Sequence, residues 1–127
     1  MENEQINEIL ADMISAYATP GLGRKAVLKT AQRLAMSVLE DSAEVKGENP
    51  FETVRDAIDR YGSVLGSGGE SMICGVILSG TASMNPCYVI VKLNGNRAEI
   101  RAYAKEGLIK QHTAEKAVKA LKEALSD

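Results

Sequence analysis

Apolar residues in the first part of the chain recur at intervals of three and four, the spacing of one face of an α-helix. One such stripe lies within residues 6–17 and comprises Ile6, Ile9, Leu10, Met13, Ile14 and Tyr17. Gly and Pro in residues 19–23 end this stripe, and a second one runs from Val27 to Leu39. The pattern predicts two amphipathic helices before the polar segment at 41–48.

A third helix is predicted from Pro50 to Tyr61, where the apolar spacing of three and four returns. Asn49 precedes it as an N-cap, and Pro50 suits the first helical position, whose N–H has no partner within a helix. Gly62 follows, and we expect it to be the left-handed residue beyond the helix end.

The sequence "GSVLGSGGE" at 62–70 is rich in glycine, as are loops that bind phosphate. A phosphate-binding loop of that kind needs a strand before it, a helix after it and a lysine at its end. Here a predicted helix precedes the loop, a predicted strand follows it, and Glu70 takes the place of the cation. We therefore interpret residues 63–70 as a joint between two halves of the fold.

After residue 70 the apolar period changes from 3.6 to 2, which is typical of strands. Residues 71–79 are apolar on both faces, and residues 87–93 and 97–104 flank Asn94-Gly95, a strong hairpin signal. A two-residue turn at Asn94-Gly95 gives four predicted pairs: Leu93–Asn96, Val91–Ala98, Val89–Ile100 and Cys87–Ala102. A last helix is predicted over 114–125, with Thr113 as its cap.

These elements predict one α+β domain spanning residues 1–127. Its order is αααβββα: three N-terminal helices in residues 1–62, the joint at 63–70, and a three-stranded antiparallel β-meander with a C-terminal helix in 71–127. The helices are expected to pack on the apolar face of the sheet.

Composition and charge remove several classes of function. The 127 residues carry a net charge of −2, and no apolar run reaches the length of a membrane span. The first ten residues do not resemble a secretory signal, so we expect a cytoplasmic protein with no membrane partner. Cys74 and Cys87 lack Cys-x-x-Cys spacing, and a single His112 does not complete a zinc site, so no metal or other cofactor is expected.

Binding to duplex DNA is not expected, although three helices followed by a hairpin resemble a winged helix-turn-helix in order. The recognition helix would be the third one, and it carries Glu52, Asp56 and Asp59 against two arginines. A net-acidic helix is poorly suited to a groove lined with phosphates.

The hairpin face away from the predicted core supports two hypotheses. In the predicted register Tyr88 faces Arg101 there, and tyrosines interleaved with bases can bind a single-stranded nucleic acid. The same face could instead form an apolar patch that needs cover. We expect that patch to lie in a homodimer interface or under the N-terminal helices, and its residues are Ile73, Ile77, Tyr88 and Ile90.

The end of the sheet opposite the hairpin turn is a third candidate site. Hydroxyls and cations from the loops at 79–86 and 105–113 meet there with the start of the last helix, which suits a small anion. The candidate residues are Ser79, Thr81, Ser83, Lys105, Lys110 and His112. No acid is placed by motif to orient His112, so catalysis is not expected.

The leading hypothesis is a small non-catalytic domain that self-associates as a homodimer and acts by binding a partner. The alternatives are an anion sensor or enzyme at the loop end, and a single-stranded nucleic-acid binder on the Tyr88/Arg101 face.

Overall fold

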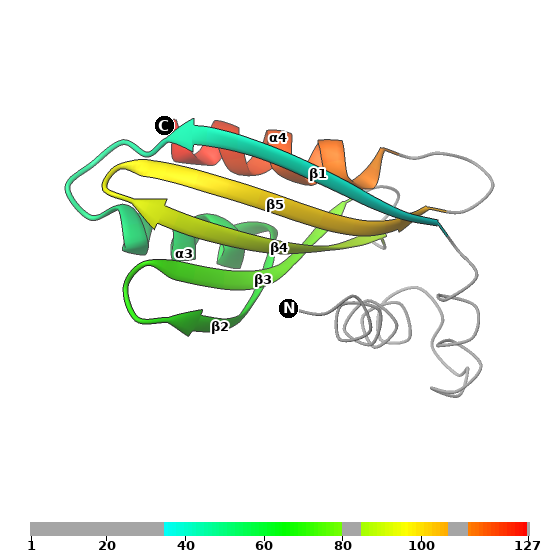
Figure 1. The fold of residues 1–127 in the computed structure, drawn as a ribbon, viewed down its shortest axis with the longest axis horizontal. Coiled ribbons are helices and arrows are strands. Elements are labelled where there is room, and N and C mark those ends of the chain that lie inside the picture. The colour runs from blue at the N-terminus through cyan, green and yellow to red at the C-terminus, as the bar shows by residue number, and fades with distance from the viewer. Residues whose placement is uncertain (1–34, 80–84, 107–111, 127) are drawn as a thin grey trace.

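A computed structural model describes residues 35–79, 85–106 and 112–126, in which a five-stranded antiparallel sheet is backed by two helices (Figure 1). The strands lie in the order β1-β5-β4-β3-β2. Both helices lie behind the sheet in Figure 1, so one sheet face is covered by helices. The elements are β1 (Ala35–Glu44), α3 (Pro50–Tyr61), β2 (Gly62–Gly68), β3 (Met72–Ser79), β4 (Asn85–Asn94), β5 (Arg97–Glu106) and α4 (Thr113–Leu125).

The predicted fold class, three N-terminal helices with a three-stranded meander, is wrong. Residues 35–39, expected in the second helix, begin strand β1. This strand pairs with β5 at ten successive positions, from Ala35 opposite Glu106 to Glu44 opposite Arg97. That pairing outweighs the helix propensity of its Ala, Met and Leu residues. The helix expected over residues 6–17 and the first part of the second one lie outside the described residues.

The predicted joint at 63–70 is also corrected, because most of it belongs to the edge strand β2. Gly62 pairs with Ile77 and Gly68 with Met72, with an irregularity between Val64 and Gly66. Gly62 is extended, with φ −176°, and is not a left-handed residue. A Cβ on Gly62 would lie 1.7 Å from the Val76 carbonyl oxygen, so the close approach of the two backbones requires glycine there.

Helix α3 confirms the prediction for residues 50–61. The Asn49 side-chain oxygen accepts a hydrogen bond from the Glu52 N–H at 3.4 Å, and Pro50 occupies the first turn. The helix buries Val54, Ala57 and Ile58 against the sheet. The residues that mark the start of this helix are its own neighbours in sequence, so the helix could be predicted without knowledge of the rest of the fold.

The predicted β4–β5 hairpin is present, but its turn is centred one residue later. Asn94 pairs with Arg97, so the turn residues are Gly95 and Asn96, and only Gly95 of the two has a positive φ (62°). The Asn96 side chain donates hydrogen bonds to the carbonyls of Val45 and Gly47, both at 3.0 Å. The turn is therefore tied to the segment that follows β1.

The register of β4 and β5 consequently differs by two residues from the predicted one. The observed pairs include Leu93–Ala98, Val91–Ile100, Val89–Ala102 and Cys87–Ala104. A shift of two keeps every side chain on its predicted face. On the other face, the observed register places Lys92 opposite Glu99. The predicted register placed Lys92 opposite Arg97, which is a second cation.

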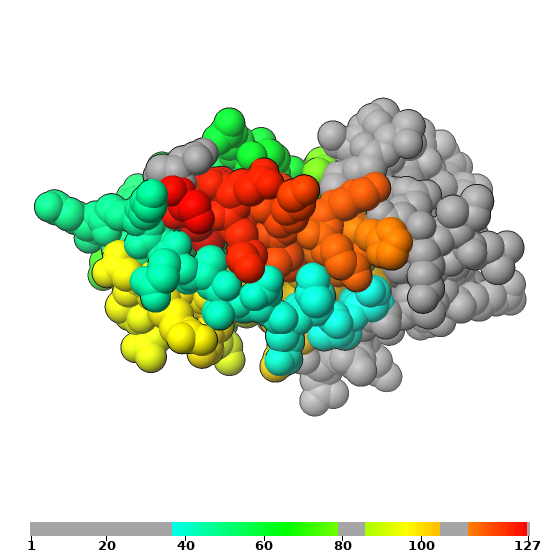
Figure 2. Space-filling view, turned by 90° about the horizontal axis from the view of Figure 1, so that it is seen from above, coloured from blue at the N-terminus to red at the C-terminus, as the bar shows by residue number. Residues whose placement is uncertain are grey.

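Helix α4 confirms the last predicted helix, although its cap differs. Thr113 is buried in the first turn, while His112 is the N-cap residue and makes no capping hydrogen bond through its side chain. The helix packs beside β1 and β5, and Figure 2 shows it lying along β1. In the described part of the chain, no helix is long and apolar enough to cross a membrane.

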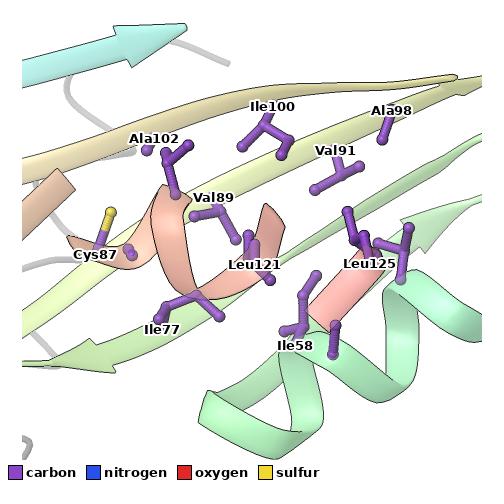
Figure 3. Close-up of a cluster of buried hydrophobic side chains, with 14 of the residues drawn as sticks. Ile58, Ile77, Cys87, Val89, Val91, Ala98, Ile100, Ala102, Leu121 and Leu125 are labelled. Carbon is purple, nitrogen blue, oxygen red and sulfur yellow. The ribbon is translucent and has the colours of Figure 1, made fainter. Parts of the chain in front are cut away.

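The main core lies between the sheet and the two helices (Figure 3). Ile58 of α3 and Leu121 and Leu125 of α4 are fully buried there. They face inward-pointing residues of β3, β4 and β5, which are Ile73, Ile77, Cys87, Val89, Val91, Ala98, Ile100, Ala102 and Ala104.

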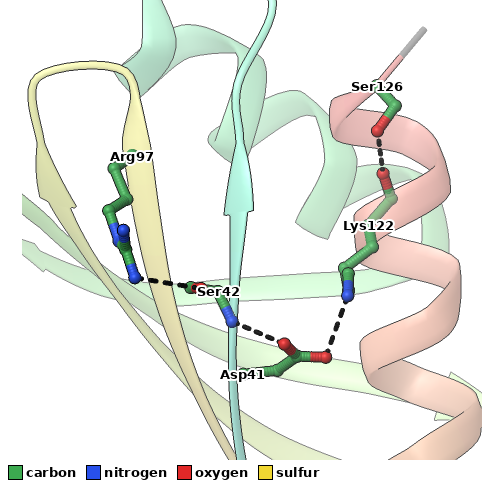
Figure 4. Close-up of polar contacts among 5 residues, drawn as sticks. All are labelled: Asp41, Ser42, Arg97, Lys122 and Ser126. Atoms are coloured by element: carbon green, nitrogen blue, oxygen red, sulfur yellow. Dashed lines mark hydrogen bonds and ion pairs between the residues drawn. The ribbon is translucent and has the colours of Figure 1, made fainter.

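A polar contact fastens β1 to α4 at the edge of this core (Figure 4). The Lys122 ammonium donates to the Asp41 carboxylate at 3.0 Å, and the same carboxylate accepts from the Ser42 N–H at 2.7 Å. These two contacts lower the pKa of Asp41. The pair is exposed, so its main effect is to orient the edge strand, and the apolar core supplies most of the stability.

Candidate functional site

The loop end that sequence analysis proposed as an anion site is only partly described. Ser79 ends β3 and Lys105 lies near the end of β5, and His112 precedes α4. Antiparallel pairing places the first two at the same end of the sheet, as expected. Thr81, Ser83 and Lys110 lie outside the described residues, so the anion pocket stays a prediction.

His112 itself is exposed and has a positive φ of 54°. Its Nδ1 atom lies 3.7 Å from a carboxylate oxygen of Glu115, one turn into α4. A carboxylate at this helix start weakens the attraction that the N-terminus would exert on an anion.

The four predicted interface residues do not share one face of the sheet. Ile73 pairs with Val91 and Ile77 with Cys87, which places both isoleucines in the helix-covered core. Tyr88 and Ile90 project from the other face. The expectation of a single patch fails because alternate residues of β3 point to opposite sides, and β3 is apolar on both sides.

This other face, which we call the second face, has its own apolar cluster. Val76, Tyr88 and Tyr103 occupy neighbouring strands and are buried. The two tyrosine rings are tilted by 43°, with centroids 6.3 Å apart. Three partly buried residues pack against this cluster, and they are Cys74, Leu78 and Ile90.

The Tyr88 hydroxyl is buried and finds no hydrogen-bond partner among the described residues. Burial raises the pKa of Tyr88 well above its ordinary value of 10.0, and Cys74 and Tyr103 beside it act in the same direction. The phenol is therefore held neutral, and its burial is a cost to the fold.

Replacing Tyr88 by phenylalanine is expected to raise the free energy of unfolding by about 1 kcal/mol at neutral pH, because a buried unpaired hydroxyl is removed and the ring is kept. Above its ordinary pKa of 10.0 a tyrosine ionises in the unfolded chain, while folded Tyr88 keeps its proton. Wild-type stability should therefore fall as the pH rises past 10.0, and Tyr88→Phe should lose less. Urea denaturation at neutral and alkaline pH measures both effects.

Tyr61→Phe is the matched control, because Tyr61 is a half-buried tyrosine on α3. It should leave stability within about 0.5 kcal/mol of wild type. A loss of stability in Tyr88→Phe at neutral pH would mean that the hydroxyl has a favourable partner.

The second face is hollowed over a volume of about 790 Å³, and Tyr88 and Tyr103 of the cluster form part of its lining. Ile90, Met72 and Cys74 provide apolar lining. Charged side chains of both signs line the rest of this hollow, and they are Glu40, Lys92, Arg97, Glu99 and Arg101. The hollow therefore combines apolar surface with both acids and bases.

Most of these charges already have partners within the chain. Arg101 forms an ion pair with Glu40 on the neighbouring strand, and Tyr103 and Glu40 both raise the pKa of Arg101. Lys92 stands opposite Glu99 in the β4–β5 register. The Arg97 guanidinium donates to the Ser42 hydroxyl at 3.3 Å.

The sequence indicated Tyr88, Ile90 and Arg101 on this face, but it did not indicate Glu40, Met72 or Cys74. Glu40 joins the site only because β1 pairs with β5, and no local pattern indicated that pairing. Cys74 could have been placed beside Ile90 had the correct face of β3 been chosen.

The described residues contain no group of three or more His, Cys, Asp and Glu side chains that could hold a metal ion. Comparison with known proteins gives no assignment: no family model, curated protein or solved structure matches the chain.

Proposed function

We propose that this protein is a binding module that associates with a second copy of itself through the hollow on the second face. The observation that carries the proposal is the composition of the hollow, in which apolar side chains lie among acids and bases. Protein surfaces present such mixtures, with an apolar centre and a polar rim.

The charge balance supports a polypeptide partner over a polyanion. A nucleic acid requires cations that are free to neutralise phosphates. Here Arg101 is paired with Glu40, and Lys92 faces Glu99. Tyr88 and Tyr103 are buried and offer little ring surface for stacking with bases. The single-stranded nucleic-acid hypothesis therefore has less support than self-association.

A second copy is favoured among polypeptides because the hollow can complement itself. In a two-fold dimer the same patch faces its own copy, so each acid must meet a base. On the second face, Glu40 belongs to the edge strand β1, while Lys92 lies two strands away on β4. This separation allows Glu40 of one copy to face Lys92 of the other.

Sedimentation equilibrium across micromolar concentrations tests the proposal. The wild type should show a dimer mass, and Lys92→Glu should weaken dimerisation by about tenfold, since it places like charges across the interface. Lys116→Glu makes the same charge change at an exposed position on α4 and should leave the dimer unchanged.

Lys92→Glu also places an acid opposite Glu99, so its fold is checked by urea denaturation. Arg97→Glu is a second variant with an exposed side chain in the hollow, and it should weaken the dimer in the same way. A wild-type monomer mass at all these concentrations would overturn the proposal, as would equal weakening by Lys116→Glu.

A further inference from the structure

Strand β1 forms an open edge of the sheet next to helix α4. It pairs with β5 at ten successive positions, and no described strand pairs with its other side. Val38 is 53% exposed on this strand, and Figure 2 looks onto this edge, with α4 lying along it. The opposite edge, β2, is shorter, and its register shifts between Val64 and Gly66. The long and regular β1 is therefore the better template for a further strand.

Half of the main-chain groups of β1 point away from the sheet. The Val45 N–H, just beyond the strand, donates to the Asn96 carbonyl at 2.7 Å. Because hydrogen-bonded positions alternate in an antiparallel pair, the even-numbered residues of β1 direct their N–H and C=O groups outward. The Ser42 N–H fits this alternation, since it donates to a side chain and not to β5. Among the described residues, none bonds to the outward main-chain groups of Val38 or Glu40.

A groove of about 410 Å³ lies between β1 and α4, on the helix-covered side of this edge. Leu39 and Val118 give the groove its apolar lining. Asp41 and Lys122 also line it, and they neutralise each other at 3.0 Å. A strand added beside β1 would direct every second side chain toward this groove.

The other charges of the groove lie on α4 and are mainly acidic. Glu115 and Glu123 are exposed and lie eight residues apart, a rise of about 12 Å along a helix, with Lys119 between them. The His112 ring lies 3.7 Å from Glu115, whereas Glu123 has no ion-pair partner among the described residues. Residues i and i+4 of an extended strand are about 13 Å apart, so two bases at that spacing match the two carboxylates. Between them, Lys119 would repel a base, and the apolar lining favours an apolar side chain.

We propose that the free edge of β1 binds an extended peptide as a sixth strand, with an apolar side chain toward the groove between two basic ones. Strand addition of this kind gains affinity from main-chain hydrogen bonds and specificity from alternate side chains. Strand β1 of a second copy is a poorer occupant, because its charged residues are Glu40, Asp41 and Glu44 and include no base. The proposal is independent of the proposed dimer, whose hollow lies on the second face.

Fluorescence anisotropy with synthetic peptides tests the proposal on the full-length protein. A labelled peptide of sequence Thr-Lys-Thr-Val-Thr-Lys-Thr should bind with saturation. Thr-Glu-Thr-Val-Thr-Glu-Thr should bind about tenfold more weakly, because it places carboxylates beside Glu115 and Glu123. The lysine peptide with N-methyl groups on its three central residues keeps its charges but loses main-chain donors, and it should also bind about tenfold more weakly.

Two pairs of variants assign the binding to this edge. Val38→Pro removes an outward N–H, which an edge strand tolerates, and should weaken binding of the lysine peptide about tenfold. Val38→Ala keeps the N–H and should bind within about twofold of wild type. Glu123→Lys should remove most of the preference for lysine over glutamate, whereas Glu70→Lys, at an exposed position between β2 and β3, should leave it unchanged. Urea denaturation checks that each variant is folded.

Binding should not depend on the proposed dimer, so Lys92→Glu should bind the lysine peptide within about twofold of wild type. Loss of binding in this variant would place the peptide in the hollow and overturn the proposal. Absence of saturable binding by the lysine peptide would also overturn it, as would equal affinity for the lysine, glutamate and N-methylated peptides. The peptide comparison uses the wild-type protein, so it decides the question even if Val38→Pro does not fold.

Discussion

Replacing Gly62 by alanine will destabilise the protein by more than about 3 kcal/mol. The added Cβ would lie 1.7 Å from the Val76 carbonyl oxygen and 2.7 Å from its carbonyl carbon. Both are backbone atoms of β3, which is held between β2 and β4 and has little freedom to move. Urea denaturation, followed by circular dichroism, measures the loss.

Gly66→Ala is the matched control, because Gly66 lies in the same strand. Its nearest contact for a new Cβ is the Cys74 sulfur at 3.7 Å, an ordinary separation. This variant should stay within about 0.5 kcal/mol of wild type or gain slightly, since alanine restricts the unfolded chain. Equal stability of the two variants would show that the approach of Gly62 to β3 does not constrain the fold.

Truncating Leu121 to alanine is expected to cost about 2–5 kcal/mol, because it leaves a cavity between α4 and the sheet. The side chain is fully buried among residues of the main core. Lys119→Ala, at an exposed position of the same helix, should change stability by less than about 0.5 kcal/mol. The shift of the urea midpoint at constant slope reports both values. A small loss in Leu121→Ala would mean that α4 contributes little to the core.

The parts of the fold that sequence analysis located correctly are those with local signals. Asn49 and Pro50 mark the start of α3, and the period of two marks β4 and β5 on either side of a glycine turn. The predicted register of that hairpin differs from the observed one by two residues. The alternation of apolar and polar residues does not reveal this error, because a shift of two leaves every side chain on the same face of the sheet. The pairing of Lys92 with Glu99 favours the observed register on charge alone.

The errors occurred where distant pairing decides the structure. Residues 35–39 contain good helix formers, and only a neighbouring strand from the other end of the chain makes them a strand. Likewise, the serines and glycines of β2 carry almost no strand signal, and they pair because β3 offers an edge. The hollow could not be predicted in full for the first of these reasons, since its wall at Glu40 belongs to β1.

The place of β1 in the sheet has a consequence for how the chain folds. Strands β2, β3 and β4 each pair with the next strand in sequence, whereas β1 pairs with β5, more than 50 positions away. Closing that long loop is slow, so β1 is expected to join the sheet last. Until it does, β5 exposes an unpaired edge that the β1 strand of another molecule can occupy. Refolding at high concentration should therefore produce strand-exchanged oligomers that refolding at low concentration avoids.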